Sequence, residues 1–181
     1  MRLYHACNEE IQNPDVHYGR KNADFGQGFY LSDDLEFSKR WAKERRGMDT
    51  VINIYELDTE GLSILVFDRN EDWFDYIYDN RHFKKDAHAE DVIIGPIAND
   101  TLYDVLGITT SGILNKEQSF QLLNIGPVYE QIVLKTEKAS SQLKWLDAQF
   151  LDHKEIEYYK ILVKQEETEF QRLFAEAMDR I

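Results

Sequence analysis

A glycine-rich segment that runs directly into a short aromatic segment is the most informative stretch of this sequence. Residues 19–31 read Gly19-Arg20-Lys21-Asn22-Ala23-Asp24-Phe25-Gly26-Gln27-Gly28-Phe29-Tyr30-Leu31. From residue 8 to residue 27 the chain is polar and lacks the periodic apolar residues of a helix or strand. Residues 28–31 are apolar and aromatic, which is typical of a buried strand. We therefore predict a strand that follows a long loop, and long loops in compact domains usually bind something.

Short strands and helices are predicted on both sides of this loop. Apolar or alternating patterns predict strands at residues 3–6, 51–57, 62–67, 91–96 and 132–134. The strands at 51–57 and 62–67 should flank a turn at Thr59-Glu60-Gly61, and the strand at 132–134 should be the last. A helix is predicted over residues 72–80 from its apolar face. Strands interleaved with helices, without regular alternation, predict an α+β domain.

Further helices are predicted from side chains that can cap a helix N-terminus. Ser32 or Asp33 should cap a helix that ends near Gly47, and Asn115 with Gln118 resembles a capping box. Two more helices are predicted by their caps and apolar residues: one capped by Asn99 and carrying Leu102, Tyr103, Val105 and Leu106, and one capped by Thr136 and carrying Leu143, Trp145 and Leu146.

The tail is predicted to be one long amphipathic helix. Residues 152–181 contain no Gly or Pro, and their apolar residues recur at steps of three and four. The chain therefore divides into a domain at residues 1–150 and a helical extension at residues 151–181. We expect this helix to pack on its own domain, as most amphipathic helices do, and the alternative is a partner protein.

Composition excludes several classes of protein. The 181 residues carry a net charge of −13, which disfavours non-specific nucleic-acid binding and binding to anionic membranes. A single cysteine excludes an intramolecular disulfide. No apolar stretch is long enough for a membrane span, and the first residues do not form a signal peptide. We therefore expect a cytoplasmic protein.

Three short segments resemble the motif strands of the ADP-ribosyltransferase superfamily, in its His-Tyr-Glu branch. In order they are Leu3-Tyr4-His5, Gly28-Phe29-Tyr30-Leu31-Ser32 and Glu130-Gln131-Ile132-Val133-Leu134. The chain is also similar to a bacterial family, domain of unknown function 3990, which is placed with the ADP-ribosyltransferase-like folds. This closer resemblance lies in Leu3-Tyr4-His5, Pro14-Asp15, residues 19–31, Trp41-Ala42, Ile94-Gly95-Pro96, Gln131-Ile132-Val133 and Thr136-Glu137-Lys138-Ala139.

The resemblance implies a split, mixed β-sheet core with flanking helices, and the periodicity of the tail adds a C-terminal amphipathic helix to it. It implies NAD as a substrate, with mono-ADP-ribosyl transfer or NAD hydrolysis as the reaction. The small size of the chain and the lack of targeting signals fit an intracellular bacterial or phage effector, or the toxin of a toxin–antitoxin pair, with an antitoxin or another partner protein on the C-terminal helix. The alternative is a catalytically inert module that binds NAD or a protein.

The resemblance also assigns roles to residues. His5 would hydrogen-bond the adenine-side ribose, Tyr30 would stack on nicotinamide, and the third-motif residue would orient the nicotinamide-side ribose. Arg20 would bind the pyrophosphate through its forked guanidinium, and Gly26 and Gly28 would let the backbone approach the ligand. The remaining residues expected to bind NAD are Ala6, Asn22, Asp24, Phe25, Phe29 and Ser32.

One site assignment stays open at this point. The third-motif residue is either Glu130, which aligns with the transferase carboxylate, or Gln131, which matches the closer family. Neighbouring strand residues face opposite sides, so only one can enter the site. No metal site is predicted, because His82, Asp86, His88 and Asp91 match no spacing that is typical of one.

Overall fold

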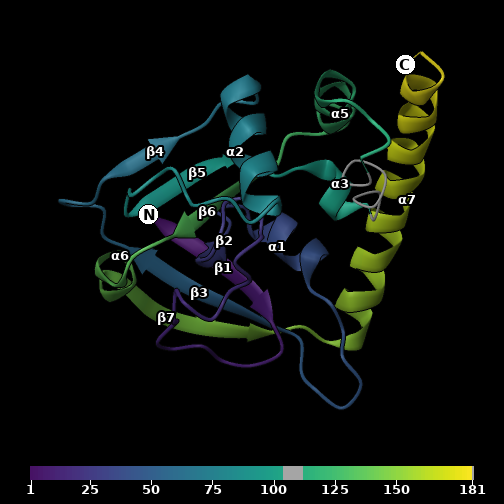
Figure 1. The fold of residues 1–181 in the computed structure, drawn as a ribbon. Helices are drawn as coiled ribbons and strands as arrows, with labels where there is room; N and C mark the ends of the chain where they lie inside the picture. The colour runs from purple at the N-terminus through teal and green to yellow at the C-terminus, as the bar shows by residue number, and fades with distance from the viewer. Residues whose placement is uncertain (104–111, 181) are drawn as a thin grey trace.

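A computed structural model describes residues 1–103 and 112–180 of the chain, which form two sheets flanked by helices (Figure 1). The strands are β1 (Arg2–Cys7), β2 (Phe29–Leu31), β3 (Val51–Leu57), β4 (Ile64–Val66), β5 (Val92–Pro96), β6 (Glu130–Leu134) and β7 (Leu143–Phe150). The helices are α1 (Leu35–Trp41), α2 (Glu71–Arg81), α3 (Asn99–Leu102), α5 (Lys116–Leu123), α6 (Glu137–Ser141) and α7 (His153–Met178). The α+β class predicted from the sequence is confirmed.

Among the described residues, one backbone bridge joins the two sheets. The first is antiparallel with strand order β1-β3-β7, and the second has the order β2-β6-β5-β4, in which only β4 and β5 are parallel. Tyr4 of β1 and Ser32, just after β2, exchange backbone hydrogen bonds of 2.8 and 3.0 Å. The strands that flank the long loop therefore lie side by side, one in each sheet.

Strand β6 is buried on both faces, and this organises two apolar clusters. Ile132 and Leu134 face a cluster between the sheets that includes Leu3 and Leu31. Val133 faces the opposite side, in the cluster that α2 covers. Successive strand residues point to opposite faces, so an unbroken apolar run is what a strand buried on both sides requires.

Several local predictions are confirmed. Residues 8–27 contain no helix or strand, and strands occur at the five predicted places before residue 100. Asn115 and Gln118 form the expected capping box of α5. The tail forms the expected long helix, α7, which a second capping box of Asp152 and Glu155 opens.

The predicted helix around Leu143, Trp145 and Leu146 is wrong, because these residues form strand β7. Thr136 does cap a helix, but α6 ends at Ser141. β7 then pairs antiparallel with β3 along its length, so β6 is not the last strand. The free edge of β3 explains the difference, and the Trp145 indole nitrogen donates to Asn53 Oδ1 of that strand at 3.1 Å.

The predictions for the first helix are also corrected. Asp34, rather than Ser32 or Asp33, caps α1 by accepting a hydrogen bond from the backbone nitrogen of Phe37 at 3.0 Å. Ser32 is held in the bridge between the sheets instead. α1 ends at Trp41 and does not reach Gly47. The intervening residues 43–49 are all exposed, and Met48 is the only large apolar side chain among them, so they have no apolar face to bury.

Two further expectations concern residues 51–67 and 99–106. The predicted strands before and after residue 60 belong to different sheets and do not form a hairpin. Asn99 is not a cap, since its side chain instead donates to the carbonyls of Ile125 and Pro127 at 2.7 and 2.8 Å. Val105 and Leu106 lie outside the described residues.

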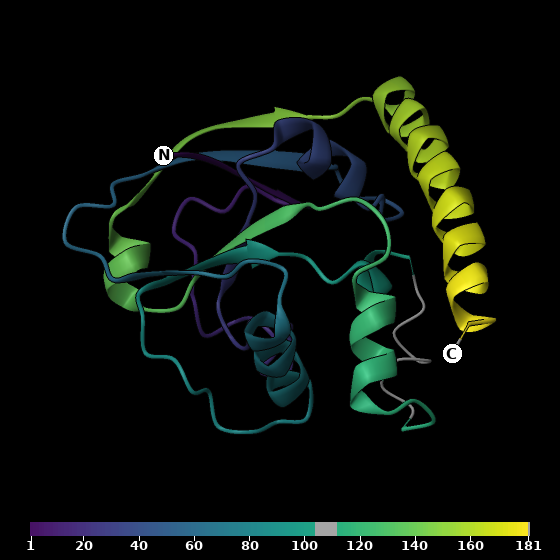
Figure 2. The ribbon, with the colours of Figure 1, turned by 90° about the horizontal axis from the view of Figure 1, so that it is seen from above.

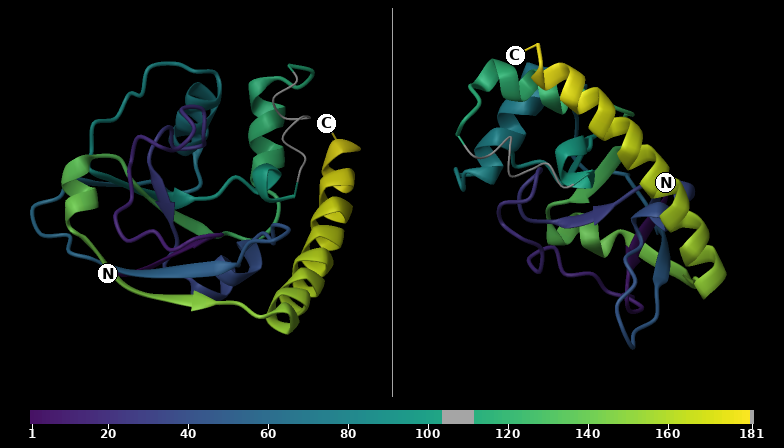
Figure 3. Two further views of the ribbon diagram at one scale, coloured as in Figure 1. Left: turned by 90° about the horizontal axis from the view of Figure 1, so that it is seen from below. Right: turned by 90° about the vertical axis from the view of Figure 1, so that its right-hand side faces the viewer.

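Helix α7 packs against its own domain, as Figures 2 and 3 show from several sides. Near its start Ile156 packs with Ile52 and Leu151. Further along, Phe170 and Phe174 join a cluster with Tyr103 and Leu122, beside α5. Within residues 1–103 and 112–180, no helix combines the length and apolar character needed to span a membrane.

Truncation after Phe150 should destabilise the domain. It would remove four buried side chains, those of Ile156, Tyr159, Phe170 and Phe174, and expose the residues that they contact. Burial of each such side chain contributes about 1.5–3 kcal/mol to stability. We expect aggregation, or a thermal midpoint lowered by at least about 5 °C, in a melt followed by circular dichroism. A truncated protein with unchanged stability would contradict the packing role of α7.

Replacing Gly28 by Ala should strongly destabilise the fold. An added Cβ would lie 2.6 Å from Val133 Cγ1 and 2.7 Å from the Leu134 carbonyl oxygen, so β6 would have to move. We expect a loss of about 3 kcal/mol in urea unfolding. Gly61→Ala is the control, because φ is +73° there and nothing lies within 4 Å, and it should cost only about 1–2 kcal/mol. Equal losses would contradict this account.

Candidate functional site

A cavity of about 250 Å³ lies where β1 and β2 meet, beside α1. Its described lining residues are Tyr4, His5, Ala6, Arg20, Ala23, Asp24, Tyr30, Leu31, Ser32, Phe37, Ser38, Trp41, Ile97, Thr101 and Gln131. They come from all three motif strands, from the long loop and from α1. A second cavity of about 530 Å³ shares Phe37, Trp41 and Thr101 with it, and α7 lines its far side. The two cavities therefore adjoin.

His5 is held as a neutral hydrogen-bond acceptor. Its Nδ1 lies 2.7 Å from the Tyr30 carbonyl oxygen, which can only accept, so Nδ1 carries the proton. Burial lowers the pKa of His5, although the bond to Tyr30 opposes this shift. The imidazole is therefore neutral near pH 7, and its Nε2 lone pair is available to accept a hydrogen bond from a ligand hydroxyl.

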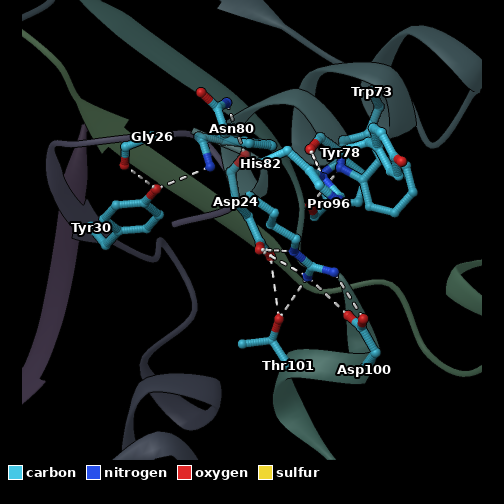
Figure 4. Close-up of polar contacts among 12 residues, drawn as sticks. Asp24, Gly26, Tyr30, Trp73, Tyr78, Asn80, His82, Pro96, Asp100 and Thr101 are labelled. Atoms are coloured by element: carbon cyan, nitrogen blue, oxygen red, sulfur yellow. Dashed lines mark hydrogen bonds and ion pairs between the residues drawn. The ribbon is translucent and has the colours of Figure 1, made fainter. Parts of the chain in front are cut away.

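The Tyr30 hydroxyl fastens the end of the long loop. It donates to the Gly26 carbonyl at 2.7 Å and accepts from the Phe25 backbone nitrogen at 3.0 Å (Figure 4). Burial, and next the charge of Asp24, raise the pKa of Tyr30 well above its usual value, so it remains protonated. With the hydroxyl engaged, the side of the ring that lines the cavity presents an aromatic surface.

Gln131 enters the cavity and Glu130 does not. Gln131 lines the cavity at only 7% exposure, whereas Glu130 is exposed at the start of β6. Among the described residues, Gln131 Nε2 is buried and has no hydrogen-bond partner. An unpaired buried donor costs about 1–3 kcal/mol, so this amide is suited to a ligand acceptor.

A buried ion-pair network lies behind two of the lining residues, Asp24 and Thr101. Arg81, at the end of α2, donates to Asp24 Oδ1 at 2.8 Å and to both oxygens of Asp100 at 2.8 and 3.0 Å. It also donates to Thr101 Oγ1 at 2.8 Å, so it joins the long loop to α2 and α3 (Figure 4). Burial raises the pKa of Asp24, and the charge of Arg81 opposes that shift.

The family model for proteins of unknown function DUF3990 matches residues 1–145. The chain belongs to this family. No curated protein and no solved structure matches the chain significantly. The match to DUF3990 includes every strand that contributes to the cavity, while α7 lies beyond it.

The structure brings together only some of the site residues predicted for this DUF3990 protein. Those that line the cavity are His5, Ala6, Arg20, Asp24, Tyr30, Ser32 and Gln131. Those that do not are Asn22, Phe25, Gly26, Gly28, Phe29 and Glu130. Phe25 and Phe29 are buried in the two apolar clusters instead. Gly28 lies against Val133 and Leu134, so its missing side chain serves strand packing.

Sequence reasoning did not place Phe37, Thr101 and Arg81 at the site. Phe37 fits a core position of a helix equally well, and Thr101 belongs to no recognised motif. Arg81 has the position of an ordinary basic residue in the last turn of a helix. Trp41 did carry a signal, as part of the family resemblance in Trp41-Ala42, but that signal assigned no role.

The structure scatters the residues that were considered as metal ligands. Asp86 pairs with Lys135 at 2.9 Å, His82 bonds the Tyr78 carbonyl, and Asp91 accepts from Ser63 and Thr136. Within the two described ranges, no three His, Cys, Asp or Glu side chains gather as a metal site would need.

Removal of the Arg81 side chain should destabilise this DUF3990 protein. Arg81→Ala would leave Asp24 and Asp100 buried without the cation that both contact, so we expect a loss of about 3–5 kcal/mol. Urea unfolding measures this loss. Lys84→Ala removes a solvent-accessible ion pair with Asp79, whose two side chains are 59% and 46% exposed, and should leave stability nearly unchanged. An Arg81→Ala protein as stable as this control would contradict the structural role of the network.

Proposed function

We propose that this DUF3990 protein binds NAD in the cavity and cleaves the bond between nicotinamide and ribose, with ADP-ribose passing to an acceptor or to water. The observation that carries the proposal is the meeting of His5, Tyr30 and Gln131 in one cavity. They come from β1, β2 and β6, which are the three strands that resemble the ADP-ribosyltransferase motifs.

The available hydrogen-bonding atoms match a nucleotide with two riboses. His5 Nε2 can accept a hydrogen bond from a ribose hydroxyl, and the Gln131 amide can donate to a hydroxyl oxygen. The Tyr30 ring can stack on the planar nicotinamide. Arg20 is exposed at the cavity and offers a forked donor to the pyrophosphate. The adjoining second cavity gives room for the remainder of the dinucleotide.

Cleavage of NAD requires orientation and charge stabilisation. The departing nicotinamide leaves positive charge on the ribose, so a catalyst must hold both rings and stabilise that charge. A neutral His5, a stacking Tyr30 and an amide at Gln131 supply orientation. None of the three supplies negative charge.

The lack of a negative charge on these three side chains favours a second candidate function, in which the protein binds NAD without cleaving it. Gln131 lies in the cavity where Glu130 would have to lie in order to act as the transferase carboxylate. An amide is neither a base nor an anion at neutral pH. Measured NAD binding without release of nicotinamide would establish this second function.

Calorimetric titration with NAD tests the site directly. We expect micromolar binding, weakened at least about 10-fold by His5→Ala and by Gln131→Ala, because each loses a hydrogen bond worth about 1.5 kcal/mol. Glu130→Gln is the matched control, because Glu130 is exposed and does not line the cavity, and it should change binding less than about 2-fold.

The Tyr30→Phe substitution removes the hydroxyl and keeps the aromatic ring, so it separates their two contributions. The variant should keep most of its NAD affinity, and its folding stability should fall. Wild-type protein that does not bind NAD, or binding that depends on Glu130 and not on Gln131, would overturn the proposal.

A further inference from the structure

Cleavage of NAD needs a negative charge near the ribose, and the cavity contains one that is not on the last motif strand. Among the described lining residues, Asp24 is the only one with a carboxylate. Glu130 points away, and Gln131 is neutral. Asp24 comes from the long loop, in the segment that most strongly resembles the family.

Arg81 contacts one oxygen of the Asp24 carboxylate and leaves the other to weaker partners. Both contacts from Arg81 fall on Oδ1, at 2.8 Å from Nε and 2.8 Å from an Nη atom. Thr101 Oγ1 approaches Oδ2 only at a long 3.5 Å (Figure 4), and the Ala98 backbone amide also hydrogen-bonds the carboxylate. Arg81 donates to both Asp24 and Asp100, so two carboxylates share its one positive charge.

Asp24 also lies near the side chain proposed to stack on nicotinamide. The carboxylate is close enough to raise the pKa of the Tyr30 hydroxyl, as the second cause after burial. Tyr30 and Asp24 line the same cavity, and the bonds from Tyr30 to Phe25 and Gly26 hold the residues that follow Asp24. The carboxylate therefore has a fixed place beside the leaving-group region.

We propose that Asp24 is a catalytic residue whose carboxylate stabilises the positive charge on the ribose as nicotinamide leaves, and that Arg81 is the residue that positions it. This inference rests on the proposed NAD cleavage. The bond between C1′ and the nicotinamide nitrogen breaks, and both of its electrons leave with the nitrogen, which gives neutral nicotinamide. Water then adds to C1′ and releases its extra proton to solvent. Asp24 stays ionised throughout.

The test compares Asp24→Asn, Gln131→Glu and the double variant, by nicotinamide release and by calorimetric NAD binding. Asp24→Asn should lower kcat about 100-fold, a typical loss for one preorganised charge-stabilising group, and change NAD affinity less than about 3-fold. When Gln131→Glu is added to the Asp24→Asn variant, kcat should rise again by at least about 10-fold, because the second substitution returns a carboxylate to the same cavity. A purely structural role of Asp24 would give no such rescue.

Asp91→Asn is the matched control. It removes a buried carboxylate that pairs with Lys138 at 3.1 Å and accepts from Ser63 and Thr136, and Asp91 neither lines the cavity nor contacts Arg81. We expect its stability loss to be comparable and its kcat to fall less than about 3-fold. Equal losses of kcat in the two Asn variants, or no rescue by Gln131→Glu, would overturn the role of Asp24 and leave NAD cleavage itself intact.

A measurement on wild-type protein covers the case in which Asp24→Asn does not fold. A pyrrolidine analogue of ribose, protonated at neutral pH, should inhibit nicotinamide release at least about 10-fold more tightly than its uncharged tetrahydrofuran counterpart. Equal inhibition would overturn the proposal. Wild-type protein that binds no NAD would overturn the proposed function as well, which distinguishes the two failures.

Discussion

The guanidinium of Arg81 is the interaction on which the arrangement of the site depends. It connects Asp24 in the long loop, the end of α2, and Asp100 and Thr101 in α3. A buried charge is tolerated only when its partners satisfy it, so these three segments must stay together. The loop would otherwise be a polar segment of some twenty residues without regular structure, and loop-closure entropy would oppose a single conformation.

Tyr30 and Lys135 hold the end of the loop that leads into β2. The Tyr30 hydroxyl binds the backbone at Phe25 and Gly26, and Lys135 donates to the Phe25 carbonyl while it pairs with Asp86 at 2.9 Å. Asn80 of α2 also donates to the Asp24 carbonyl at 3.1 Å, so this end of the loop backbone is hydrogen-bonded from both sheet and helix. A preorganised loop is what a catalytic or binding site needs, because its groups need no reordering when the ligand arrives.

Local patterns in the sequence predicted the motif strands and the terminal helix, because period-2 and period-3.6 spacings are properties of neighbouring residues. Strand β7 could not be predicted in this way. Leu143 and Leu146 are three residues apart, which suits a helix, and only the free edge of β3, some ninety residues earlier, makes the segment a strand. Arg81 was missed for a similar reason, since its partner Asp24 lies 57 residues away. Interactions between distant segments decide both outcomes.

Successive side chains of β6 point to opposite faces of the strand, which explains why Gln131 belongs to the site and Glu130 does not. Val133 must face α2 and Ile132 must face the cluster between the sheets, so Gln131 necessarily shares the side of Val133. On that side, Gln131 is buried with an unpaired amide nitrogen. An apolar residue there would avoid the cost of burying an unpaired donor, so a core position alone does not account for glutamine. A ligand that accepts from this amide does account for it, and the cavity beside His5 and Tyr30 is where such a ligand fits.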